Sequence, residues 1–162
     1  MSFTVRKARK GDLDGIGRLG ASLLRQHYQF DPARFMAPGA NPEAGYAWFL
    51  GTQLEEPDVL LLVAERDGEV AAYLYAAVEP QSWKELRDEA GFIHDVVVDQ
   101  RFRRQGMGQA LMQAAAEWFA SRGMPRIVLW SAHRNESAQR LFARLGFRPT
   151  MLEMTRELPT QP

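Results

Sequence analysis

The chain contains no cysteine among its 162 residues. Disulfide bridges, thiolate metal sites and cysteine nucleophiles are therefore excluded. Long hydrophobic runs are also absent, and none approaches the roughly 20 apolar residues that a membrane-spanning helix needs. Because residues 1–10 lack the apolar centre of a signal peptide, we expect a cytoplasmic protein with no membrane partner.

A net charge is absent too, since 20 basic side chains balance 20 acidic ones. This balance argues against a general nucleic-acid-binding protein. The charges are unevenly placed, however. Residues 101–148 hold nine arginines and two acids, whereas residues 1–100 hold sixteen acids and ten basic side chains. One half of the chain therefore suits an anionic ligand and the other a cationic one, unless the asymmetry is only that of a solvated surface.

The length and the 46% hydrophobic content predict a single domain over residues 1–162 with a substantial core. Hydrophobic patterns predict a mixed α/β order, with helices that begin near residues 12, 43, 109 and 135. Asp67-Gly68 predicts a hairpin turn in the middle of the chain. We expect strands over residues 3–8, 58–65, 69–78, 92–99, 126–130 and 151–158.

The most informative motif is a glycine-spaced turn between a β-branched strand and a helix. Backbone N–H groups at a helix N-terminus form an anion site, which the helix dipole strengthens. Gly106 and Gly108 lack side chains, so a phosphate can approach the backbone closely. The pattern is neither a P-loop nor the dinucleotide fingerprint, and a tight connection without a ligand stays an alternative. The turn reads Arg103, Arg104, Gln105, Gly106, Met107, Gly108 and Gln109.

A second motif follows about one helix and one strand later, with Asn135, Ala138, Gly146 and Phe147. The two motifs together resemble those of the GNAT superfamily of acyl-CoA-dependent N-acyltransferases. Residues 103–108 match its signature Arg/Gln-x-x-Gly-x-Gly/Ala, and the second motif matches its Asn-x-x-Ala segment with a later Gly-Phe. The predicted element order also fits, so the resemblance covers nearly the whole chain.

The resemblance implies an α/β fold, a mixed and mostly antiparallel central sheet flanked by helices, with acetyl-CoA as cosubstrate. In this family the cosubstrate lies in a gap between the central strand and the strand after the glycine helix. Its pantetheine pairs with the central strand, where one amide can polarise the thioester carbonyl. Asn135 can instead be a helix N-cap, and both roles can coexist. The implied cofactor residues are Val96, Val98, Arg103, Arg104, Gln105, Gly106, Met107, Gly108, Gln109 and Asn135.

The implied reaction, direct acetyl transfer to an amine, needs a proton acceptor, because an ammonium group is not a nucleophile. Many relatives place a glutamate two residues before the pantetheine-pairing position. In this chain His94 occupies the place of that glutamate. Strand alternation predicts His94 on the same face as Val96 and opposite Asp95. The candidates for the base are His94, Asp95 and a water relayed to Glu79. Either of the first two residues can also be purely structural.

One position departs from the family pattern. Relatives often carry a tyrosine that protonates the leaving thiolate, and Phe142 stands there in this chain. We expect Phe142 in the core, with water, Ser131 or Ser137 as possible acids. No histidine and carboxylate spacing suits a metal, so we expect none.

The acceptor expected from the resemblance is an amine of a small molecule or peptide, and the acidic first half favours a cationic one. The alternatives are a non-catalytic acyl-CoA-binding regulatory module and an unrelated nucleotide-binding protein. Dimers are common in the family, so a homodimer is possible, but no sequence feature identifies an interface.

Overall fold

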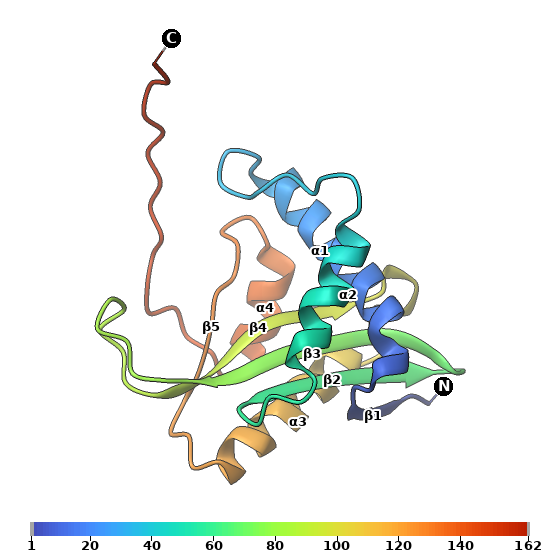
Figure 1. The fold of residues 1–162 in the computed structure, drawn as a ribbon. Helices are drawn as coiled ribbons and strands as arrows, with labels where there is room; N and C mark the ends of the chain where they lie inside the picture. The colour runs from blue at the N-terminus through green and yellow to red at the C-terminus, as the bar shows by residue number, and fades with distance from the viewer. Residues whose placement is uncertain (1, 162) are drawn as a thin grey trace.

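Five strands form one mixed sheet in the order β1-β2-β3-β4-β5 in the computed structural model, which describes residues 2–161. The first four strands pair antiparallel, and β5 pairs parallel with β4. This architecture, with helices beside the sheet, confirms the expected fold class (Figure 1). The strands are β1 (Thr4–Lys7), β2 (Val59–Arg66), β3 (Glu69–Glu79), β4 (Ala90–Val98) and β5 (Ile127–Leu129).

The helices cover both faces of the sheet and bury two apolar clusters. Ile16 and Leu50 pack with Val63 between the sheet and helices α1 and α2. On the other face of the sheet, Leu111 and Phe119 of α3 pack into the second cluster. The helices are α1 (Leu13–Phe30), α2 (Pro42–Gln53), α3 (Met107–Ser121) and α4 (Glu136–Arg144), with 3-10 turns η1 (Lys10–Asp12) and η2 (Gln100–Phe102). Among residues 2–161, no helix is both long and apolar enough to cross a membrane.

At one point along its pairing with β3, the strand β4 has one residue more than β3 does. Asp95 lies opposite Tyr75 and Ile93 lies opposite Ala76, so His94 is the extra residue of a β-bulge. A bulge changes which residues share a face of the sheet. The expected regular alternation through this strand is therefore interrupted at His94.

The side chains confirm this interruption. Ile93 and Val96 both pack with the α3 cluster, although they are three residues apart. Asp95 turns to the other face, where it bonds Tyr73 of the α1 cluster. His94 lies on that same face, since its ring is 5.0 Å from that of Tyr75. The prediction that His94 shares a face with Val96 and opposes Asp95 was wrong, because the bulge turns both candidate bases to one side.

The expected last strand does not form. Residues 148–161, here called the C-terminal arm, have no regular secondary structure. They leave the body as an extended segment (Figure 1). The alternating pattern of residues 151–158 favours an extended backbone. A strand also needs a neighbouring strand, and no described strand forms backbone pairing with the arm.

Candidate active site

The strands β4 and β5 separate halfway along β4 and leave a gap between the last two strands of the sheet. Their pairing covers only Gly91–Ile93 against Ile127–Leu129. The Asp99 N–H donates to Ala71 on β3, so alternation turns the Val96 and Val98 backbone groups away from β3. These groups face the gap, where an extended ligand could pair with them as an additional strand.

The glycine turn lies at one end of this gap, between β4 and α3. Gly106 is the N-cap of α3 and has φ +83°, a left-handed conformation that favours glycine. No described side chain caps α3 at this residue, so the first N–H groups of the helix are left for an anion. Arg104 also has a positive φ, of 64°, and stands exposed in the turn.

Gly108 differs from Gly106 because the protein itself does not require a glycine there. A Cβ at this position would meet Leu141 and Val98 at 3.7 Å, which is ordinary contact. The residue sits in the first turn of α3, where alanine is a better helix former. The absence of a Cβ at Gly108 leaves the backbone of this turn open to close approach.

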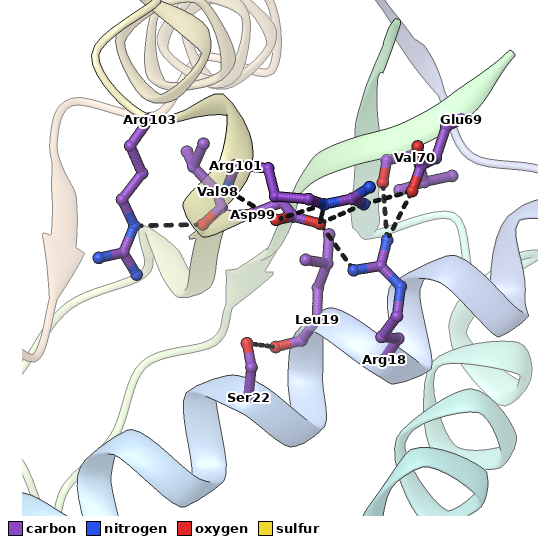
Figure 2. Close-up of polar contacts among 9 residues, drawn as sticks. All are labelled: Arg18, Leu19, Ser22, Glu69, Val70, Val98, Asp99, Arg101 and Arg103. Atoms are coloured by element: carbon purple, nitrogen blue, oxygen red, sulfur yellow. Dashed lines mark hydrogen bonds and ion pairs between the residues drawn. The ribbon is translucent and has the colours of Figure 1, made fainter. Parts of the chain in front are cut away.

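A buried carboxylate anchors the start of the turn to the first helix. Asp99 accepts hydrogen bonds from Arg18 at 2.7 Å and from the Arg101 guanidinium at 2.8 Å (Figure 2). It also accepts from the Arg101 backbone N–H at 2.9 Å as the N-cap of η2. Glu69 contacts both arginines. These contacts, with Arg101 foremost, hold the pKa of Asp99 well below its usual range.

Replacement of Asp99 by asparagine should destabilise the protein by roughly 1–3 kcal/mol at pH 7, because two arginines lose their buried partner while the cap is kept. The pKa of the folded-state carboxyl is depressed, so its contribution is complete above about pH 5 and falls as the pH drops through the ordinary carboxylate range. Thermal melts at pH 7 and pH 3 should therefore show that the difference in melting temperature between wild type and Asp99→Asn is smaller at pH 3. Asp14 is exposed, so Asp14→Asn should melt at nearly the wild-type temperature at either pH. An equal loss of stability in Asp14→Asn and Asp99→Asn would contradict this account.

Arg103 belongs to the same connection between β4 and α3 and lies beside the gap. Its Nε lies 3.5 Å from the Val98 carbonyl oxygen (Figure 2). Gln105 accepts a hydrogen bond from Arg66, which fixes the middle of the turn against β2. The predicted anion-binding residues therefore lie together around the end of β4.

His94 lies where β4 parts from β5, and a carboxylate orients it. Its Nε2 is 2.8 Å from Glu79 Oε1 on β3. The ring stacks on Phe92 at 4.7 Å between centroids, and the side chain is about one-third exposed (32%). When the neutral ring donates from Nε2 to Glu79, its Nδ1 is an acceptor that can take a proton.

Asp95 has a more enclosed environment on the same face. Its Oδ2 accepts a hydrogen bond from the Tyr73 hydroxyl at 2.9 Å. Burial raises the pKa of Asp95, against the opposing effects of this bond and of the His94 charge. Burial and the Asp95 charge also raise the pKa of Tyr73 well above its usual value. Sequence reasoning missed Tyr73, whose signal was only its place two residues before Tyr75 on a strand.

The residues of the second motif have structural partners. Asn135 caps α4, because its Oδ1 accepts from the Ala138 N–H at 3.3 Å. This confirms its N-cap role and uses only one of its polar groups. Phe142 is buried beside Phe147 in the α3 cluster. The expectation that Phe142 belongs to the core is confirmed.

A shallow cavity of about 340 Å³ lies beside β3 and the end of α2. It adjoins the candidate base through Tyr75 and Glu79, both of which contact His94. Gln53, Glu56 and Asp58 line it too, so its carboxylates favour a cationic guest. Within residues 2–161, no group of three or more histidines and acids is arranged to hold a metal ion.

Comparison with known proteins identifies the family. The model of the acetyltransferase (GNAT) family matches residues 23–147. An uncharacterized N-acetyltransferase of Methanocaldococcus jannaschii is 27% identical over 146 residues, which are 90% of this chain and 61% of that protein. The chain therefore spans about three-fifths of the length of this relative.

Two solved structures share the fold. A GCN5-related N-acetyltransferase from Ralstonia eutropha is 28% identical, with a TM-score of 0.73 and coverage of 97% of this chain and 99% of that one. An aminoglycoside N-acetyltransferase in complex with CoA has a TM-score of 0.74 at 17% identity, with coverage of 98% and 96%, respectively. The family match spans more than half of the chain, and the gap, the glycine turn and the sheet order agree with it. The chain belongs to the acetyltransferase (GNAT) family.

Proposed function

We propose that this protein is an N-acetyltransferase that moves an acetyl group from acetyl-CoA directly to an amine of a small molecule or peptide. The observation that carries the proposal is the position of His94, at the bulge where β4 separates from β5. The free edge of β4, the uncapped start of α3 and the candidate base are thereby brought to one gap. Family membership supplies the reaction class.

The donor side of the gap uses mainly backbone groups. Val96 and Val98 offer N–H and C=O groups to the pantetheine, and the N–H groups of residues 104–109 hold the pyrophosphate. Arg103 and Arg104 add positive charge, and Asn135 lies at the start of α4. Acetyl-CoA supplies the thioester carbonyl that the amine attacks.

His94 then accepts the proton that the attacking amine loses. Glu79 fixes the ring and stabilises the imidazolium that results. A backbone N–H of β4 beside the bulge stabilises the oxyanion that develops on the carbonyl. Phe142 has no proton to give, so we assign the protonation of the leaving thiolate to water or to a nearby hydroxyl such as Ser131 or Ser137.

We infer that the acceptor is cationic. The cavity beside His94 is lined by Glu56, Asp58 and Glu79, and Tyr75 gives it one aromatic wall. Asp58 is also paired with Arg122, which offsets part of its attraction. Such an acceptor should bind more weakly as the ionic strength rises, because salt screens exposed charges.

Release of free CoA from acetyl-CoA, measured with a thiol reagent across monoamines, polyamines, aminoglycosides and peptides, tests the proposal. The absence of cysteine from the chain keeps the protein background low. We expect turnover on cationic amines, with a KM that rises between about 50 and 300 mM salt, since that range shortens the screening length. A KM that ignores salt would contradict the cationic acceptor alone.

The second candidate, a non-catalytic acyl-CoA-binding module, is favoured by the buried Phe142. It predicts a higher melting temperature with acetyl-CoA and no turnover on any amine. Turnover that requires His94 would exclude this alternative. An unchanged melting temperature with acetyl-CoA would contradict both candidates.

A further inference from the structure

Five rings, here called the aromatic row, cross the face of the sheet that carries His94. The His94 ring lies 5.0 Å from that of Tyr75 on one side and 4.7 Å from that of Phe92 on the other, between centroids. The row continues from Tyr75 to Phe49 of α2 at 5.9 Å. At its other end it continues from Phe92 to Trp130 at 5.4 Å. The proposed base therefore lies in the middle of a continuous aromatic surface.

Trp130 directly follows β5 and lies on the same face of the sheet as His94. Ile127 and Leu129 of β5 pack with the α3 cluster, on the opposite face. Because side chains alternate along a strand, Trp130 turns away from that cluster, and its ring meets Phe92 edge-on. Trp130 is thereby held next to the point where β5 parts from β4, two ring contacts from the proposed base.

The two ends of the aromatic row are exposed, whereas its centre is covered. Trp130 is 70% exposed and Phe49 is 41% exposed, but Phe92 is only 5% exposed. Sites for small molecules are lined mostly by apolar and aromatic side chains with a few polar groups among them. The row has this composition, since its polar groups are the His94 ring and the Glu79 carboxylate that contacts it.

The carboxylates beside the row account for only one part of an acceptor. Glu56 and Glu79 line the cavity on the Tyr75 side of His94 and attract an ammonium group. Trp130 lies on the other side of His94, next to Phe92. A polyamine would use the carboxylates and leave the indole uncovered. An amine that also carries an aromatic ring would use both, because ring contacts add to the gain from burial.

We propose that the acceptor is a primary amine joined to an aromatic ring by a short aliphatic linker, and that Trp130 selects this ring. The inference rests on the proposed acetyl transfer and names its acceptor class. The amine lies beside His94, and its aromatic ring packs on Trp130. The amine nitrogen bonds to the acetyl carbon and gives its proton to His94. The C–S bond breaks, and the sulfur of the released CoA takes a proton from water.

Acetylation of phenethylamine and of cyclohexylethylamine tests this selection, because the two amines share the same linker and differ in whether the ring is aromatic. We expect kcat/KM to favour phenethylamine by about threefold to tenfold in the wild type. Trp130→Ala should bring this ratio close to one. Trp130→Phe keeps a ring and should preserve most of the preference, which a merely structural role of Trp130 would not predict.

Trp83→Ala is the matched control. Trp83 is 83% exposed, but it lies on the connection between β3 and β4, outside the aromatic row. The variant should therefore keep the wild-type preference for phenethylamine. Calorimetric titration of phenethylamine into the protein in the presence of CoA measures acceptor binding without turnover. There Trp130→Ala should weaken binding by roughly fivefold or more, and Trp83→Ala should not.

The outcomes separate this inference from the acetyl-transfer proposal. Equal kcat/KM for the two amines, or a preference that Trp130→Ala leaves intact, would overturn the selection by Trp130 while acetyl transfer stands. Turnover of polyamines alone would do the same. Binding of phenethylamine that depends on Trp130, with no turnover of any amine, would support the aromatic site and contradict the proposed reaction. Neither binding nor turnover of phenethylamine would overturn the inference.

Discussion

Replacing His94 by glutamine is expected to lower kcat by roughly 10²- to 10⁴-fold, the usual contribution of a general base. Glutamine can still donate a hydrogen bond to Glu79, but it cannot accept a proton at the position of Nδ1. The rise in melting temperature with acetyl-CoA should stay as in wild type, because the groups proposed to bind it lie on β4 and in the glycine turn. Steady-state kinetics and thermal melts measure the two effects separately.

Asp95→Asn is the matched control, since Asp95 follows His94 and faces the same side of the sheet. Asparagine keeps the size of the side chain and can still accept from Tyr73. We expect kcat within about tenfold of wild type. If Asp95→Asn abolished turnover and His94→Gln did not, Asp95 would be the base and the role proposed for His94 would be wrong.

Gly108→Trp is expected to remove acetyl-CoA binding, with a loss of at least 100-fold in affinity. The indole would fill the space next to the first N–H groups of α3, where the pyrophosphate is proposed to lie. A 100-fold loss corresponds to about 2.7 kcal/mol, so ligand-induced stabilisation at moderate concentrations should vanish. Thermal melts with increasing acetyl-CoA measure this directly.

Gly45→Trp serves as the comparison for this variant. Gly45 is an exposed residue of α2, and a Cβ added to it would meet no other atom within 4 Å. The variant should therefore fold and show the same acetyl-CoA shift in melting temperature as wild type. Wild-type affinity in Gly108→Trp would contradict an anion site at this turn.

The glycine turn could be predicted from the sequence because its chemistry is local. A strand end, two glycines and a helix start follow one another within a few residues, and Gly106 adopts the left-handed conformation that such a turn needs. The hairpin at Asp67-Gly68 is predictable for the same reason, since both residues have the positive φ values of a tight turn. Neither motif depends on distant parts of the chain.

The bulge and the C-terminal arm could not be predicted in this way. Whether His94 is an extra residue depends on how β4 aligns with β3. That alignment cannot be predicted from the chemistry of residue 94 alone. The arm has the alternation of a strand, but a strand also needs a neighbouring strand, which the residues of the arm do not themselves supply. The ion pair of Asp99 with Arg18 likewise joins residues 81 positions apart, a contact that only the folded chain reveals.

The bulge also affects which sequence changes at position 94 the fold can tolerate during evolution. Because His94 is the extra residue, its removal would leave a regular strand in which Ile93 and Val96 keep their present face. Position 94 can therefore change its chemistry, or be deleted, without turning the edge of β4 that is proposed to bind the cofactor. On the proposed roles, a descendant of this chain could lose the proposed base and still bind acetyl-CoA, so catalysis and ligand binding could evolve separately.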